Sequence, residues 1–208
     1  MNYFIKTPWW LKRLYPKRIW SIDTKEKVVY LTFDDGPHPV ATPFVLDELK
    51  RFNAKATFFC IGRNVTEHSG VYKRIAEEGH RVGNHTQNHL NGWKTDTPTY
   101  LADVAAASQH IDSDLFRPPY GRIRLLQSKG INEAMKNKST KIVMWDVLSG
   151  DFDNSVAKEK CLERSVSKAR PGSIIVFHDN DKAFPTLEYV LPRFLLSISE
   201  MEYRFDHL

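Results

Sequence analysis

The chain has 208 residues, 41% of them hydrophobic and 26% charged, which is the composition of one ordinary globular domain with a sizeable core. Its longest apolar runs have the length of a strand, so the sequence predicts no membrane-spanning helix. The net charge of +5 comes entirely from residues 1–20, because the rest of the chain has 25 basic and 25 acidic residues. This balance argues against a nucleic-acid-binding protein.

Residues 1–25 form a separate basic and aromatic segment before a single domain at 26–208. The segment has no apolar stretch of the length that a secretory signal needs, so we expect a cytoplasmic protein or one at the inner membrane surface. Residues 1–20 either pack as a strap across the domain or make weak contact with a membrane surface. We favour the strap, because Pro8 and Pro16 interrupt a long amphipathic helix.

Strand and helix patterns alternate from residue 27 to the end, and we expect a monomer. The predicted strands are 27–34, 56–62, 81–85, 114–117, 141–147, 173–178 and 203–208. The predicted helices are 40–52, 65–78, 99–111, 123–136, 155–169 and 186–199. This alternation predicts an α/β fold with a parallel sheet and right-handed crossovers, in a closed or nearly closed βα barrel smaller than the eightfold type. Cys60 and Cys161 lack metal-binding spacing and are expected as buried free thiols.

Polar side chains gather where these predicted strands end. Parallel βα barrels build their active sites on that rim. The residues are Asp34, Asp35, His85, His89, Arg117, Asp151 and His178.

Asp34 and Asp35 end a β-branched run and are followed by Gly36 and Pro37. Neighbouring side chains on a strand diverge, so both carboxylates can face one ligand only if the turn twists them, and we expect Gly36 to allow that twist. One carboxylate would then bind a metal, and the other would remain as a base.

His85 and His89 share a face if the residues between them form a helical turn. Two imidazoles and one carboxylate suit Zn²⁺ with open positions for water and substrate, although Co²⁺ or Ni²⁺ could replace it.

Five segments together resemble the motifs of the polysaccharide deacetylases, the NodB-homology group or carbohydrate esterase family 4, in the same order. They are TFDDGP (32–37), HTQNH (85–89), RPPYG (117–121), WDVLSGDF (145–152) and IIVFHD (174–179). The resemblance covers residues 26–208. It implies a distorted (β/α)7 barrel and metal-dependent removal of acetyl groups from N-acetylated sugars.

The resemblance also implies the role of each site residue. Asp35, His85 and His89 look like the metal ligands, and Asp34 like the base that deprotonates the attacking water. Arg117 would hold the pKa of Asp34 low. The backbone N–H of Tyr120 would stabilise the oxyanion. His178 looks like the acid that protonates the leaving amine, and Asp151 would orient it and raise its pKa.

Two positions depart from the family pattern. Phe152 stands where the family usually has tryptophan, and Val176 where it usually has leucine. Both would line the pocket for the acetyl methyl group and remain apolar. Trp93 either stacks on a sugar ring or caps the barrel, while His38 and Asp146 are interpreted as structural.

We therefore expect a metal-dependent carbohydrate N-deacetylase whose partner is an acetylated carbohydrate: peptidoglycan, a chitin-type oligosaccharide or a sugar precursor. An O-acetyl esterase acting on xylan-like carbohydrate and a non-catalytic carbohydrate-binding barrel are the alternatives.

Overall fold

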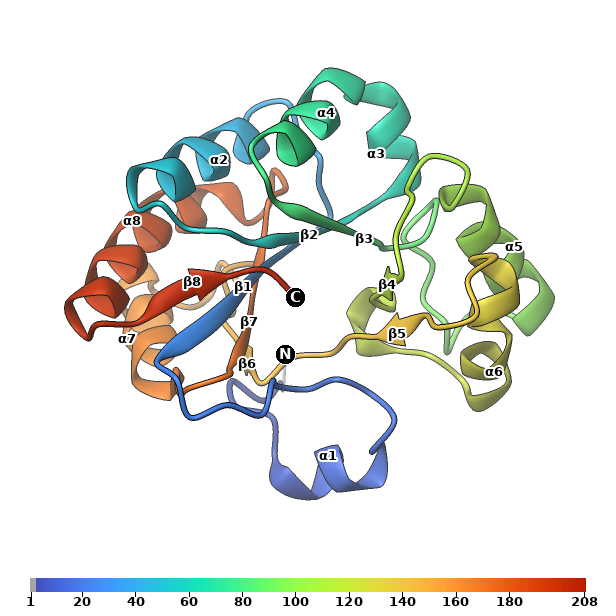
Figure 1. Cartoon of the computed structure of the whole chain (residues 1–208), viewed down its shortest axis with the longest axis horizontal. Helices are drawn as coiled ribbons and strands as arrows, with labels where there is room; N and C mark the ends of the chain where they lie inside the picture. Colours follow the sequence, from blue (N-terminus) through green and yellow to red (C-terminus); the bar gives the residue numbers. More distant parts are fainter. Residues whose placement is uncertain (1–2) are drawn as a thin grey trace.

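The computed structural model describes residues 3–208, and it is built around a curled, entirely parallel sheet (Figure 1). Its strands run in the order β5-β4-β3-β2-β1-β7-β6, and β8 pairs with the start of β1. The prediction of a distorted (β/α)7 barrel is confirmed. The strands are β1 (Val28–Asp34), β2 (Thr57–Cys60), β3 (Arg81–Asn84), β4 (Leu115–Phe116), β5 (Lys141–Ile142), β6 (Val147–Leu148), β7 (Ile174–His178) and β8 (Arg204–Asp206).

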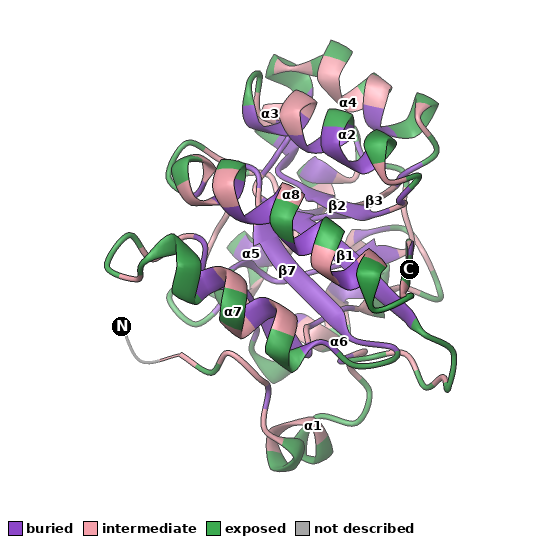
Figure 2. Cartoon of the chain, turned by 90° about the vertical axis from the view of Figure 1, so that its left-hand side faces the viewer, coloured by how far each residue is buried: buried purple, intermediate pink, exposed green. Residues whose placement is uncertain are grey.

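Helices form the outer layer, and their exposed residues face away from the buried strands (Figure 2). None of the helices within residues 3–208 combines the length and the apolar character needed to cross a membrane. They are α1 (Trp9–Leu14), α2 (Ala41–Arg51), α3 (Gly62–Glu67), α4 (Ser69–Glu77), α5 (Thr97–Ala107), α6 (Leu125–Ala134), α7 (Lys158–Lys168) and α8 (Phe184–Glu200).

The central strand β1 separates the outer core from the barrel interior. Phe33 stacks at 6.0 Å on Phe177 of β7, which in turn packs against Phe194 of α8. Because side chains alternate along a strand, Thr32 and Asp34 point to the opposite face, into the barrel. Packing of the apolar face against α8 therefore aims a carboxylate at the inner rim.

Two predicted elements are each divided in the structure. The predicted helix 65–78 is α3 and α4, which meet at His68, where the backbone is not helical (φ −119°, ψ 46°). The second helix starts at Ser69 and Gly70, which are weak helix formers, so it does not extend the first.

Both cysteines are buried and free.

The predicted strand 141–147 is β5 and β6, because it runs between two strands that have separated. Val143 N–H still bonds to Phe116 of β4, whereas Asp146 N–H bonds to Ile174 of β7. The residues between Val143 and Asp146 cannot pair with β4 and β7 at the same time. One edge of β5 and one edge of β6 are therefore open to pairing with another segment.

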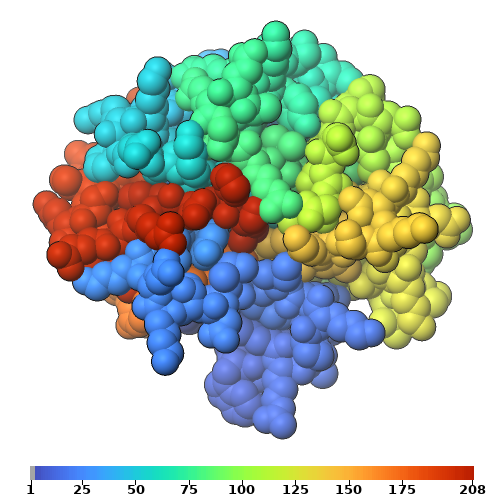
Figure 3. Space-filling model, in the orientation of Figure 1, coloured from blue at the N-terminus to red at the C-terminus, as the bar shows by residue number. Residues whose placement is uncertain are grey.

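The N-terminal segment fills this opening as a strap, here defined as residues 3–22. Leu148 N–H donates to the carbonyl of Ile5 beside β6, and Met144 N–H donates to Ile19. Between these contacts α1 forms a short helix, and Figure 3 shows the strap packed against the body of the domain.

Asp146 fixes the strap from inside. Its buried carboxylate lies 2.5 Å from both Lys6 Nζ and Lys12 Nζ, and Ser173 donates to it at 2.6 Å. Burial acts to raise the pKa of Asp146, but these hydrogen bonds outweigh it and bring the pKa below its ordinary value. Two strap cations therefore face the protein, which favours the strap interpretation over a membrane anchor.

Candidate active site

The structure brings the seven predicted rim residues together. Asp34 ends β1 and lies beside His178, the last residue of β7. His85 and Arg117 follow β3 and β4 directly, and Asp151 lies three residues after β6. Their proximity follows from parallel strands ending at one edge.

Three of these side chains converge on a common point. Asp35 Oδ1 lies 3.0 Å from His89 Nε2 and 3.5 Å from His85 Nε2, and one ligand atom from each residue lies within 4.8 Å of the others. Asp35 Oδ1 is buried and has no hydrogen-bond partner within residues 3–208. A divalent cation would supply that partner, so the residues fit a metal with mixed nitrogen and oxygen ligands.

Neighbouring groups orient the three ligands. His85 Nδ1 lies 2.7 Å from the carbonyl of Arg117, which leaves Nε2 toward Asp35. Asn180 Nδ2 donates to Asp35 Oδ2 at 2.6 Å, so Oδ1 is the oxygen left for a metal. Burial acts to raise the pKa of Asp35, but the adjacent imidazoles of His85 and His89 lower it well below its ordinary value.

The sequence did not reveal the role of Asn180. Its signal is modest: a carboxamide one residue beyond the last motif, IIVFHD, on the same rim.

The turn after Asp34 twists at a different residue from the one predicted. Asp35 itself has a left-handed backbone (φ 82°), and Gly36 does not. Gly36 is needed for space, because a Cβ there would lie 2.2 Å from Asp179 Oδ2. Asp179 also accepts a hydrogen bond from Gly36 N–H, and burial raises the pKa of Asp179 to about 8.

His85 and His89 are not joined by a helical turn, so that prediction was wrong. Thr86 and His89 have positive φ values of 65° and 57°, which bend the chain back on itself. The bend is held by Asp103 of α5, whose Oδ2 accepts from the backbone N–H groups of Gln87 and Asn88. Asp103 was overlooked in the sequence, although it is an acidic residue on the buried face of α5.

Arg117 joins the base to the metal ligands. Its fully buried guanidinium lies 2.6 Å from Asp34 Oδ1 and 2.7 Å from the Thr32 hydroxyl, while its carbonyl accepts from His85. A second nitrogen donates to the carbonyl of Met144 at 2.8 Å. A buried arginine with these fixed partners keeps the Asp34 carboxylate in one orientation.

His178 and Asp151 form a second pair beside Asp34. Asp151 accepts from the His178 backbone N–H at 2.7 Å and lies 2.8 Å from His178 Nδ1. Burial lowers the pKa of His178, but the charge and hydrogen bond of Asp151 raise it to about 9. The contact with Asp151 therefore favours the protonated form of His178.

The remaining predicted residues lie around this centre. The Tyr120 ring is 4.6 Å from the His89 ring, and the Phe152 ring is 5.1 Å from His178. Val176 is fully buried on β7, two residues before His178 and on the same face. Trp93 is 57% exposed and lines a hollow of 390 Å³ with Tyr120 and the strap.

A cavity of 490 Å³ opens beside Asp35 and His89, with enough space for a sugar unit. His38 lines it and is held structurally: its Nδ1 accepts from Val40 N–H, and its Nε2 pairs with Asp181 at 2.9 Å. The arrangement therefore combines a metal-ligand set, a carboxylate base and a protonated imidazole next to an open cavity. This combination can hydrolyse an amide or an ester.

Comparisons with known proteins agree with this chemistry. A family model described as polysaccharide deacetylase matches residues 21–141. The chain is 32% identical over 191 residues to the peptidoglycan-N-acetylglucosamine deacetylase of Bacillus cereus, covering 89% of this chain and 88% of that one. It is 32% identical over 165 residues to the chitooligosaccharide deacetylase of Azorhizobium caulinodans, covering 76% of each chain.

The similarity extends to a solved structure. The crystal structure of the Bc1960 peptidoglycan N-acetylglucosamine deacetylase superposes with a TM-score of 0.85 at 30% identity, covering 97% of this chain and 95% of that one. The segments 145–152 and 174–179 lie beyond the range of the family model, whereas the structural match covers 97% of the chain.

Proposed function

Because this chain belongs to the polysaccharide deacetylase family, we propose that it removes acetyl groups from N-acetylated sugars by metal-assisted hydrolysis. The observation that carries the proposal is the convergence of His85 and His89 on the buried Asp35 Oδ1, which accepts no hydrogen bond from the described residues, with a separate base and acid beside it. Zn²⁺ fits this ligand set best, and Co²⁺ or Ni²⁺ could replace it.

The residues of the chain divide the work. A metal held by Asp35, His85 and His89 would polarise the acetyl carbonyl and lower the pKa of water. Asp34 accepts the proton of the attacking water, and Arg117 keeps that carboxylate oriented. The backbone N–H of Tyr120 donates to the oxyanion as it forms.

His178 acts in the second half of the reaction, when the amine leaves. An amine is a poor leaving group until it is protonated, and His178 supplies that proton as the C–N bond breaks. Asp151 orients the ring and stabilises its protonated form. The products are acetate and a sugar with a free amine. The two neighbours thus have different roles: Arg117 orients the base, and Asp151 favours the protonated form of the acid.

The substrate class is a polymer or oligosaccharide that contains N-acetylglucosamine. The relatives that match this chain are named as peptidoglycan and chitooligosaccharide deacetylases, which supports this choice. An O-acetyl esterase would use the same base and metal ligands but would need no protonated His178. A non-catalytic barrel would not need the Asp34–Arg117 and His178–Asp151 pairs.

The test is release of acetate from matched substrates. Purified protein loaded with Zn²⁺ or Co²⁺ is incubated with chitooligosaccharides of increasing length, peptidoglycan fragments and acetylated xylan. We expect metal-dependent release from the N-acetylated sugars, abolished by a chelator. Faster release from acetylated xylan would favour the esterase, and no release from any substrate by the metal-loaded protein would favour the non-catalytic barrel.

A further inference from the structure

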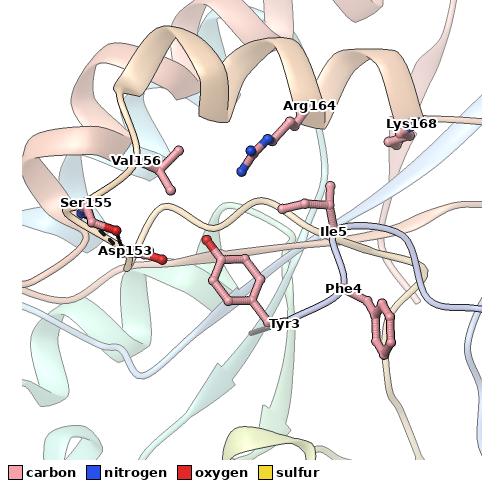
Figure 4. Close-up of a pocket in the computed structure, with 8 residues that line it drawn as sticks. All are labelled: Tyr3, Phe4, Ile5, Asp153, Ser155, Val156, Arg164 and Lys168. Atoms are coloured by element: carbon pink, nitrogen blue, oxygen red, sulfur yellow. Dashed lines mark hydrogen bonds between the residues drawn. The ribbon is translucent and has the colours of Figure 1, made fainter. Parts of the chain in front are cut away.

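A second cavity, of 620 Å³, lies between the strap and α7 (Figure 4). One wall comes from the strap, and the opposite wall comes from α7 and the loop before it. The lining residues are Tyr3, Phe4, Ile5, Asp153, Ser155, Val156, Arg164 and Lys168.

Two ring contacts connect this cavity with the active site. The Tyr3 ring lies 5.2 Å from the Phe152 ring, and Phe152 lies 5.1 Å from the His178 ring. The cavity is therefore within reach of a group on the sugar next to the one bound at His178. Tyr3 and Phe4 also line the hollow beside Trp93 and Tyr120, so the strap borders both spaces.

The cavity carries a net positive charge, because its lining has two basic side chains and one acidic one. Figure 4 shows the Arg164 side chain extending from α7 into it, and Lys168 lies one helical turn further on. Within residues 3–208 neither side chain forms an ion pair. The one acidic residue in the lining, Asp153, instead accepts from the Ser155 hydroxyl at 2.6 Å and from the Ser155 N–H at 3.2 Å.

Tyr3 adds a hydrogen-bonding group. Its hydroxyl is buried and has no hydrogen-bond partner within the described part of the chain. Burial raises the pKa of Tyr3 to about 12, so the hydroxyl keeps its proton and can donate it to an acceptor. A guanidinium, an ammonium and a phenol around one space are a recognition set for a carboxylate.

We propose that this cavity binds a carboxylate carried by the glycan, next to the N-acetylated sugar that the active site hydrolyses. Arg164 and Lys168 supply the opposite charge, and Tyr3 supplies a hydrogen bond. The inference rests on the proposed function and narrows its substrate class to glycans with acidic substituents, such as the lactyl carboxylate of peptidoglycan.

The experiment uses the full-length, metal-loaded protein and a matched pair of ligands. One is a peptide-free peptidoglycan glycan fragment with free lactyl carboxylates, and the other is the same fragment with those carboxylates converted to amides. Binding is measured by calorimetry and turnover by acetate release. The variants are Arg164→Gln, Lys168→Gln and their combination, with Arg164→Lys to keep the charge and lose the planar fork. Lys160→Gln on the outer face of the same helix is the control.

We expect wild type to bind the carboxylate form more tightly than the amide form. In the double variant the Kd for the carboxylate form should rise about tenfold and its kcat/KM should fall about tenfold, with no change for the amide form. Arg164→Lys should lose less than Arg164→Gln, and Lys160→Gln should match wild type. Equal affinity of wild type for both forms, or equal losses on both, would overturn the proposal. If neither form is deacetylated, the proposed function fails, while the calorimetric preference still decides whether this cavity binds the carboxylate.

Discussion

Asp34 and His178 are neighbours at one rim, and each is held by a buried partner of opposite charge. Asp34 is paired with a buried arginine, and His178 is paired with a buried aspartate. Because of these partners the rim holds a carboxylate fixed in one orientation beside an imidazole whose pKa is raised. For the proposed reaction, the partners Arg117 and Asp151 therefore matter as much as Asp34 and His178 themselves.

The His178–Asp151 pair makes a prediction about pH. The pKa of His178 is raised to about 9, so the acid form is present below that pH and is lost as the pH rises through it. Turnover of N-acetylated sugars should fall above about pH 9. In Asp151→Asn the supporting charge is lost, the pKa of His178 falls, and this alkaline limb should move down by roughly one pH unit or more.

The measurement is the pH profile of kcat on an N-acetylated oligosaccharide and on an aryl acetate. The phenolate of an aryl acetate leaves without a proton, so the alkaline limb of the pH profile for this substrate should depend little on His178. An Asp151→Asn profile that coincides with wild type on the oligosaccharide would contradict the acid role.

Asn180 makes a prediction about metal affinity. Its amide fixes Asp35 Oδ2 at 2.6 Å, and without it the carboxylate can rotate away from the histidines. Asn180→Ala should weaken Zn²⁺ binding roughly 10- to 100-fold with little change in folding. Competition with a chelating dye measures the affinity, and Asn132→Ala on the exposed face of α6 is the control. Unchanged affinity in Asn180→Ala would show that Asp35 needs no such support.

At the scale of elements, the bend between the two histidines depends on a helix that carries no site residue. Asp103 of α5 accepts from the N–H groups of Gln87 and Asn88 and from the Asn88 amide. Asp103→Ala would remove the hydrogen bonds that this buried carboxylate accepts from the bend, so we expect a loss of about 1–3 kcal/mol in unfolding free energy together with weaker metal binding. Denaturant unfolding and metal titration measure the two effects. Asp112→Ala, outside this network, should change neither.

The strap makes the second prediction at this scale. Asp146→Ala leaves Lys6 and Lys12 without their common partner, and the melting temperature should fall by roughly 5–10 °C. Because the pKa of Asp146 is lowered on folding, its stabilisation is present above its ordinary pKa of 3.8 and is lost as the pH falls below it. The difference in melting temperature between wild type and Asp146→Ala should therefore shrink in acid.

Thermal unfolding at neutral and acidic pH, with vesicle binding measured in parallel, checks the strap. An unchanged melting temperature in Asp146→Ala, together with tight binding of wild type to anionic vesicles, would favour the membrane anchor instead.

At the scale of the whole molecule, the sequence predicted those features of the fold that depend on local sequence patterns. Apolar runs that end in polar residues marked the strands and their carboxyl ends, so the barrel and its rim were accessible from the chain alone. The break between β5 and β6 was not, because it depends on the separation of β4 from β7. The bend at Thr86 and the twist at Asp35 were missed for a similar reason: they are held by Asp103 and Asp179, which lie far away in the sequence. The cellular compartment and the monomeric state stay predictions.

The most direct test of the account separates metal binding from turnover in Asp34→Asn. In the proposed mechanism Asp34 is the base and not a ligand, so this variant and wild type should each bind one divalent ion per chain. It should lose acetate release from N-acetylated oligosaccharides by roughly 10²- to 10⁴-fold. The double variant His85→Ala, His89→Ala should lose both the ion and the activity. Metal stoichiometry and kcat measured on the same preparations decide the matter. Wild-type turnover in Asp34→Asn, or undiminished metal content in the double histidine variant, would contradict the assignment.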